Sequence, residues 1–146
     1  MLGALHGLTM RSTRVLVDDD LAVLAFGLRT TPGRPLRSWS FRVFSIAWRL
    51  QSGTRLIAGS GDEPDVLRET VGVLDGCAVR AVSLHPGTMD TTFDYGDREL
   101  RIFPVTSVVA PRHWQQWSVR TPGGGYIDVG PGASWSRRGT PGERKQ

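Results

Sequence analysis

The sequence is short of cysteine, with Cys77 as the one thiol in 146 residues. A single cysteine excludes an intramolecular disulfide framework and is typical of proteins from a reducing compartment. No apolar run approaches the roughly 20 residues that a membrane-spanning helix needs. Residues 1–14 also lack the basic leader and the long apolar segment of a signal peptide. We therefore expect a cytoplasmic protein without a membrane helix.

Residues that carry catalysis or bind metals are also scarce. The three histidines, His6, His85 and His113, stand at no metal-ligand spacing, and the sequence has no cysteine pair. Cys77 could act as a nucleophile with a distant histidine, but it opens a predicted strand, a common place for a small buried hydrophobe. We therefore predict no catalytic residue, no metal and no cofactor, and we do not expect an enzyme.

Two further patterns have ordinary structural interpretations. The glycines at 123–125 resemble a phosphate-binding loop, but no Lys-Ser/Thr pair or helix follows them, so they predict a hairpin turn. The aspartates at 18–20, with Asp90, Asp94 and Asp97, could supply oxygen ligands to a divalent cation. They lack the spacing of a calcium-binding loop, and aspartate is an ordinary turn residue.

The basic balance is concentrated near the C-terminus. The net charge is +4, and residues 137–146 carry +3 of it, through Arg137, Arg138, Arg144 and Lys145 against Glu143. Residues 1–136 are therefore nearly neutral, which does not favour a broad nucleic-acid footprint. We predict one folded domain over residues 1–136 and a disordered basic tail over residues 137–146.

Glycine and proline are abundant, at 18 and 9 residues, and they separate short runs with alternating apolar positions. This pattern is typical of antiparallel strands joined by turns. The expected meander over residues 74–104 has strands marked by Val79, Val82 and Leu84, by Met89 and Phe93, and by Leu100 and Ile102. The predicted fold is α+β and mainly antiparallel sheet, a meander or partial barrel with one helix packed on it.

The aromatic stretch over residues 36–50 changes its apolar phase. Its apolar residues stand first at odd and then at even positions: Trp39, Phe41, Val43, then Phe44, Ile46, Trp48, Leu50. A continuous strand would turn its second half inside out, because side chains alternate between the two faces. We therefore predict a β-bulge at Val43–Phe44, or a break there into two strands.

One helix is predicted, over residues 63–74. Asp62 is the expected N-cap, and Pro64 suits the first turn. The apolar stripe contains Val66, Leu67, Val71 and Leu74, and we expect it to face the sheet.

Two stretches of the sequence echo each other. Leu5-His6-Gly7 with Met10, followed by a hairpin that closes on Phe26, parallels Leu74-Asp75-Gly76 with Val79 and a hairpin that closes on Phe93. The echo is short and needs a two-residue gap, so it suggests two related β units without establishing a duplication.

The C-terminal two-thirds, residues 48–136, resembles a family of small, mostly uncharacterised bacterial proteins. The motifs that carry the resemblance are Gly59-Ser60-Gly61-Asp62, Leu74-x-Gly76-x-x-Val79, Leu100-Arg101-Ile102-Phe103-Pro104, Trp114-x-x-Trp117-x-Val119-x-Thr121-Pro122 and Val129-Gly130-Pro131-Gly132-x-x-Trp135. Such proteins are similar to immunity-type or accessory partners in bacterial toxin and conflict systems. The resemblance implies a fold and a protein partner, but no catalytic residue.

The sequence thus favours a non-catalytic protein-binding domain, an immunity-like inhibitor of a toxin or an accessory subunit. Exposed aromatic and arginine residues are enriched at interface hot spots, and the predicted contact residues are Trp39, Arg42, Arg49, Trp114 and Trp117. The alternative is a nucleic-acid-binding module, in which arginines interleaved with aromatics on a sheet face hold phosphates and stack bases. A small-ligand-binding domain or a hydrolase comes third.

Overall fold

The computed structural model describes residues 5–18, 21–29, 38–44, 47–103, 117–129 and 135–139. Its strands are β1 (Thr9–Asp18), β2 (Leu21–Arg29), β3 (Ser38–Val43), β4 (Ala47–Ser52), β5 (Arg55–Gly59), β6 (Ala81–Leu84), β7 (Thr91–Asp94), β8 (Glu99–Phe103), β9 (Trp117–Arg120), β10 (Tyr126–Val129) and β11 (Trp135–Arg138). The α-helix α1 (Pro64–Thr70) continues into the 3-10 helix η2 (Val71–Leu74).

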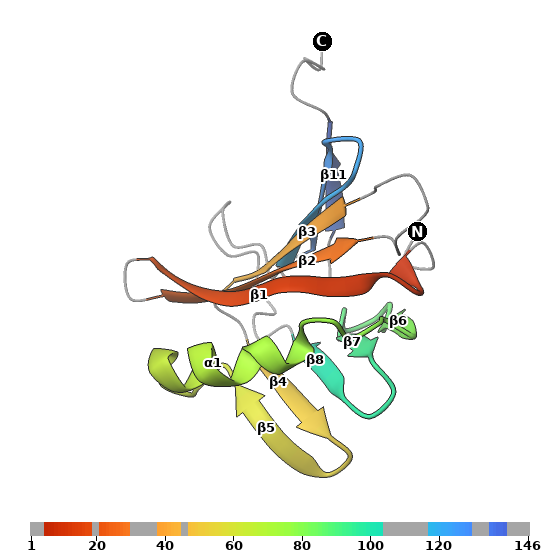
Figure 1. Ribbon diagram of the computed structural model, residues 1–146. Coiled ribbons are helices and arrows are strands. Elements are labelled where there is room, and N and C mark those ends of the chain that lie inside the picture. The colour runs from red at the N-terminus through yellow and green to blue at the C-terminus, as the bar shows by residue number, and fades with distance from the viewer. Residues whose placement is uncertain are drawn as a thin grey trace.

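These strands form two antiparallel sheets packed face to face (Figure 1). The six-stranded sheet has the order β1-β2-β3-β9-β10-β11, and the five-stranded sheet has the order β5-β4-β8-β7-β6. The predicted α+β fold, dominated by antiparallel sheet, is confirmed. The described strands form two open sheets instead of one sheet curved towards a barrel. No helix of the described residues is long and apolar enough to cross a membrane.

Aromatic rings from both sheets make the centre of the core. Phe26 and Phe41, neighbours on β2 and β3, stack with ring centroids 4.9 Å apart. Phe93 of the opposite sheet meets both rings edge-on, at 5.7 and 5.3 Å. The Trp117 ring lies 5.7 Å from Phe41, and its Nε1 donates a hydrogen bond of 3.3 Å to Oγ1 of Thr91. Edge-to-face and stacked pairs are the favoured ring arrangements, so this cluster joins the two sheets.

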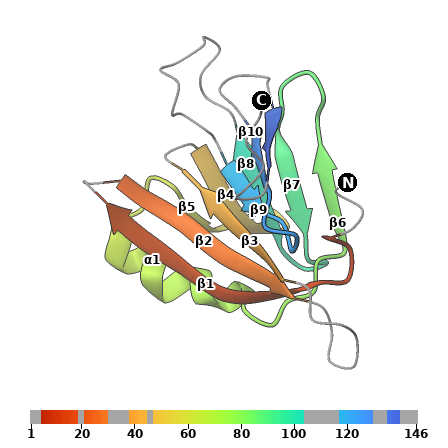
Figure 2. The same ribbon diagram turned by 90° about the horizontal axis from the view of Figure 1, so that it is seen from above.

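The phase change at Val43 marks the point where the chain leaves one sheet for the other. Phe41 and Val43 are buried in the six-stranded sheet, whereas Trp48 and Leu50 are buried in the five-stranded one. The predicted break into two strands is therefore confirmed. Because β3 and β4 belong to different sheets (Figure 2), the apolar residues of both strands are buried in the same core.

The two echoed stretches pair with each other. Backbone hydrogen bonds run from N of Gly7 to O of Val79 (2.7 Å), from N of Met10 to O of Cys77 (2.9 Å), from N of Gly76 to O of Met10 (2.9 Å) and from N of Val79 to O of Leu8 (2.8 Å). We call this pairing of residues 5–10 with residues 74–79 the clasp. Both glycines of the clasp have positive φ, 82° at Gly7 and 85° at Gly76, a conformation that glycine adopts without strain.

The two halves of the chain follow the same plan. In the first half β1, β2 and β3 form a meander in one sheet, and β4 and β5 then cross to the other. In the second half β6, β7 and β8 form a meander, and β9 and β10 cross back. The separation between Leu5 and Leu74 recurs between Trp48 and Trp117 and between Leu50 and Val119. The structure thus extends the short echo to two β units that exchange strands.

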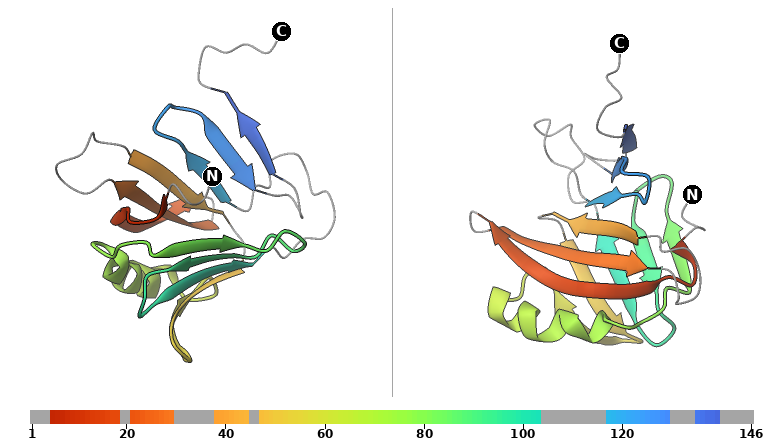
Figure 3. Two further views of the ribbon diagram at one scale, coloured as in Figure 1. Left: turned by 90° about the vertical axis from the view of Figure 1, so that its right-hand side faces the viewer. Right: turned by 45° about the horizontal axis from the view of Figure 1, so that its top comes forward.

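The helix lies along an edge of the two-sheet stack (Figure 3). It contacts β1 and β5, the terminal strands of the two sheets, instead of crossing one sheet face. Leu67, Val71 and Leu74 are buried, as predicted, but Val66 is 49% exposed, so its assignment to the buried face is wrong. The three buried residues follow one another at i, i+4 and i+7, and Val66 stands one position off that stripe.

Other boundaries also differ from the predicted ones. Asp62 does not cap α1, because its Oδ2 accepts a hydrogen bond of 2.9 Å from N of Gly59 in the preceding turn. Met89 stands in the turn before β7, with φ 64°. The basic tail was predicted to begin at residue 137, but Arg137 and Arg138 belong to β11 and pair with β10. Residues 140–146 lie outside the described residues.

The buried stripe of the helix predicts that neighbouring positions respond very differently to charge. Leu67→Asp should lower the free energy of unfolding by on the order of 3 kcal/mol or more, because it buries a carboxylate. Val66→Asp, the same chemistry on the exposed side, should cost less than about 0.5 kcal/mol. Urea denaturation of both variants checks this. Equal midpoints would contradict the observed helix face.

The buried phenol of Tyr95 predicts a loss of stability at high pH. Burial, with the nearby Cys77 contributing, raises the pKa of Tyr95 above its ordinary value. An unfolded chain releases this proton near about pH 10 while the folded protein keeps it, so stability falls by up to about 1.4 kcal/mol per pH unit above that point. In urea titrations at rising alkaline pH, Tyr95→Phe should lose stability less steeply than the wild type. Parallel slopes would refute this linkage.

Candidate functional site

The five predicted contact residues do not lie together. Trp117 is 1% exposed, so its prediction as a surface contact is wrong: it shares the inward face of β9 with Val119. Trp39 is half-buried and packs against the core. Arg42 and Arg49 are both exposed, but they belong to different sheets. Trp114 lies outside the described residues.

Arg42 belongs to a row of polar positions on the outer face of the six-stranded sheet. Phe41 and Val43 point into the core, so Ser40 and Arg42 must point outwards. The strand register links the outward positions into two rows that cross the sheet. The first row is Arg14, Ala25, Arg42, Ser118, Asp128, Ser136, and the second is Arg11, Gly27, Ser40, Arg120, Tyr126, Arg138.

Arginines dominate this outer surface, which we call the arginine face. Its exposed guanidinium groups belong to Arg11, Arg14, Arg29, Arg42, Arg120 and Arg138. Among the described residues, Arg42 and Arg120 have no ion-pair partner. Asp128 is a carboxylate within the same two rows, and Arg138 binds it. The face therefore carries excess positive charge although residues 1–136 are nearly neutral overall.

Small residues in the rows leave hollows between the arginines. Ala25, Gly27 and Ser40 occupy the outward positions next to one another on β2 and β3. Hollows of about 360, 200 and 230 Å³ open beside them, and Ser40 contributes to all three. Arg42 is shared by the first two hollows and Arg120 by the first and third. The arginine face is thus pitted along β3, with guanidinium groups at the rims.

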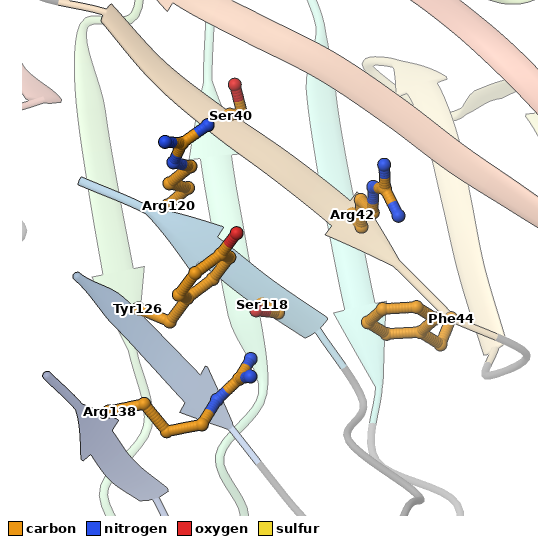
Figure 4. A pocket seen from close by; sticks show the side chains of 7 residues that line it. All are labelled: Ser40, Arg42, Phe44, Ser118, Arg120, Tyr126 and Arg138. Atoms are coloured by element: carbon orange, nitrogen blue, oxygen red, sulfur yellow. The ribbon is translucent and has the colours of Figure 1, made fainter. Parts of the chain in front are cut away.

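Ser118, Tyr126 and Arg138 line one part of the hollow of about 360 Å³ (Figure 4), and Asp128 binds two of them. The Asp128 side chain is 4% exposed and accepts hydrogen bonds from Nε of Arg138 at 2.5 Å and Nη2 at 3.0 Å. Its Oδ1 also accepts a bond of 2.7 Å from Oγ of Ser118. The Arg138 guanidinium lies 4.5 Å from the centre of the Tyr126 ring. The hydrogen bond to Asp128 raises the pKa of Arg138, so this guanidinium stays charged in a defined place.

The outer face of the five-stranded sheet has a different character. Arg49 donates a hydrogen bond of 2.8 Å to Gln51 and lies 5.0 Å from the centre of the Phe103 ring. Arg101 forms an ion pair of 2.9 Å with Glu99. Arg49 and Arg101 are therefore engaged with neighbouring side chains, whereas Arg42 and Arg120 on the arginine face have no ion-pair partner among the described residues.

The residues considered for catalysis or metal binding have structural contacts. Nδ1 of His85 accepts hydrogen bonds of 3.2 Å from N of Gly87 and N of Thr88 and closes the β6–β7 turn. Cys77 is half-buried, with its Sγ 3.5 Å from O of Val73. No group of three or more His, Cys, Asp or Glu residues within the described ranges could hold a metal ion. Asp19, Asp20 and His113 lie outside those ranges.

Comparison with family models, with curated proteins and with solved structures finds no match. The resemblance to immunity-type proteins therefore rests on the sequence motifs and stays a prediction.

Sequence reasoning missed most of the arginine face. The alternation that places Ser40 and Arg42 opposite the core is visible in the sequence, as is that of Ser118 and Arg120. The pairing of β3 with β9, which puts these residues side by side, joins distant parts of the chain. The echo between the halves was the available signal for this pairing.

The buried carboxylate of Asp128 predicts a cost for neutralising it. Asp128→Asn should lower the free energy of unfolding by about 1–3 kcal/mol, because it weakens hydrogen bonds to a charged group in a partly buried place. Asp65→Asn is the matched control: this carboxylate also pairs with an arginine, Arg68, but it is 90% exposed, and its loss should cost less than about 1 kcal/mol. Thermal and urea unfolding measure both. Equal costs would contradict a structural role for Asp128.

Proposed function

We propose that the protein is a non-catalytic binding domain that holds an acidic surface of a partner protein on its arginine face. The observation that carries this proposal is the pair Arg42 and Arg120, exposed and without ion-pair partners among the described residues. Arginine is enriched at interface hot spots because its planar fork can bind a carboxylate through two hydrogen bonds. The partner would be a toxin or a complex subunit, in the manner of the immunity-type proteins that the sequence resembles.

The placement of the aromatic residues favours a protein partner over nucleic acid. Binding of single strands relies on open aromatic rings on which bases can stack. Four rings of the stretch over residues 36–50 were predicted to stack bases. Phe41 and Trp48 are buried, and Trp39 and Phe44 are half-buried. Tyr126 does lie on the arginine face, but the Arg138 guanidinium lies over its ring. Nucleic acid remains the alternative because the face is positively charged.

The contacts of the reactive side chains favour a binding role over an enzymatic one. His85 is engaged in a turn, and Asp94 accepts a hydrogen bond of 2.7 Å from N of Gly96 in the next turn. A general base or a nucleophile needs a partner oriented for proton transfer. We place the protein in the cytoplasm, because a chain with Cys77 as its one thiol suits a reducing compartment.

Charge reversal on each sheet tests this proposal. The double variant Arg42→Glu/Arg120→Glu should weaken partner binding by about a hundredfold or more, because it puts like charges against an acidic surface. Arg49→Glu/Arg101→Glu changes the net charge equally on the opposite face and should change affinity by less than about threefold. The partner is first captured from the native host with the wild-type protein. Calorimetry with the captured partner then measures its affinity for each double variant.

Equal losses in the two double variants would overturn the assignment of the arginine face. Titration with fluorescent single-stranded oligonucleotides at low and high salt tests the alternative, which is nucleic-acid binding. Tight binding that survives high salt and depends on Arg42 would replace a protein partner by nucleic acid.

A further inference from the structure

One hollow on the arginine face is lined mainly by groups that donate hydrogen bonds. Its volume is about 360 Å³, at the lower end of the range for small-molecule sites. Its lining contains the guanidinium groups of Arg42, Arg120 and Arg138 and the hydroxyl groups of Ser40, Ser118 and Tyr126 (Figure 4). The Ser118 hydroxyl already donates to Asp128, so the guanidinium groups are the main donors for a ligand. A guanidinium group donates hydrogen bonds and accepts none, so this lining suits a ligand that is rich in oxyanion acceptors.

The strand register places Arg42 and Arg120 within reach of one ligand. Arg42 on β3 stands opposite Ser118 on β9, and Arg120 stands opposite Ser40. Arg42 and Arg120 are therefore diagonal neighbours on one face, a relation that brings Cβ atoms to about 7–8 Å. Both side chains are long enough to close the remaining distance. Two guanidinium groups from neighbouring strands can thus bind the oxygens of a single group.

The charge of the hollow selects among oxyanions. Asp128 offsets the charge of Arg138, so Arg42 and Arg120 leave a charge of about +2 in the described lining. A carboxylate or a phosphodiester carries one negative charge and would leave one guanidinium without a counter-charge. A phosphate monoester carries about −1.5 to −2 at neutral pH and offers three terminal oxygens. Its charge and its acceptors both match the site.

We propose that this hollow is a binding site for the phosphate group of a small phosphate monoester, held by Arg42 and Arg120. Arg138, kept in place by Asp128, forms the third side and has N–H donors beyond the two that Asp128 accepts. Phe44, half-buried at the rim, gives apolar surface for the organic part of the ligand. This assignment goes beyond the proposed protein docking and does not depend on it. Because both ligands use Arg42 and Arg120, they would compete.

The test is a titration with adenosine 5′-monophosphate, followed through the arginine Nε signals by NMR. Adenosine, which lacks the phosphate, should bind at least tenfold more weakly. Inorganic phosphate should shift the same arginine signals. Binding should weaken several-fold at about pH 5, where the monoester loses one negative charge because its second pKa is about 6.

Variants locate the site independently of any partner protein. Arg42→Gln and Arg120→Gln should each weaken binding of the nucleotide by about tenfold or more, through loss of a charge-assisted contact. Arg101→Gln, on the opposite sheet, should leave it unchanged. All three positions are at least partly exposed, and circular dichroism confirms that the variants fold. Equal affinity for adenosine, or equal affinity in the three variants, would overturn the site. Partner docking that stays unchanged in Arg42→Gln and Arg120→Gln while nucleotide binding weakens would instead refute the proposed function.

Discussion

The exchange of strands between two sheets is the constraint on which the rest of this structure depends. Each half of the chain builds part of one sheet and then completes the other, so β3 pairs with β9 and β4 with β8. The clasp fixes the start of both halves against each other through four backbone hydrogen bonds. Asp75, within the clasp, also accepts a hydrogen bond of 2.8 Å from N of Thr13. The aromatic core can close because these pairings hold the sheets in register.

The candidate site follows from the same pairing. Ser40 and Arg42 come from the first half of the chain, whereas Ser118 and Arg120 come from the second. The hollow between them exists because β3 and β9 are neighbours at the centre of the six-stranded sheet. The five-stranded sheet has the corresponding neighbours β4 and β8, but Arg49 and Arg101 there are engaged by adjacent side chains. Similar backbones thus place the corresponding arginines in different surroundings on the two sheets.

Much of the fold could be predicted from local patterns, and the site could not. Alternation and turn residues located the strands, and the phase change at Val43 located the crossing between sheets. The helix face was predicted correctly at Leu67 and incorrectly at Val66. Apolar spacing in the sequence marks a wider band of residues than the band that is buried against the sheets. Trp117 was predicted to be a surface contact. A tryptophan can be buried in a core or exposed at a binding interface, and residue type alone does not distinguish the two. Pairing between distant strands cannot be read from local patterns.

The equivalence of the two halves has a consequence for how such a fold can arise. A chain with one unit would have edges that its own strands cannot pair, and a second copy would satisfy them by the same exchange. The protein therefore has the form of a strand-swapped homodimer joined into a single polypeptide. In a true homodimer every substitution appears twice, once on each face. Joining the units removes that coupling, so the two faces can carry different side chains, and a helix can follow β5 where a further strand follows β10.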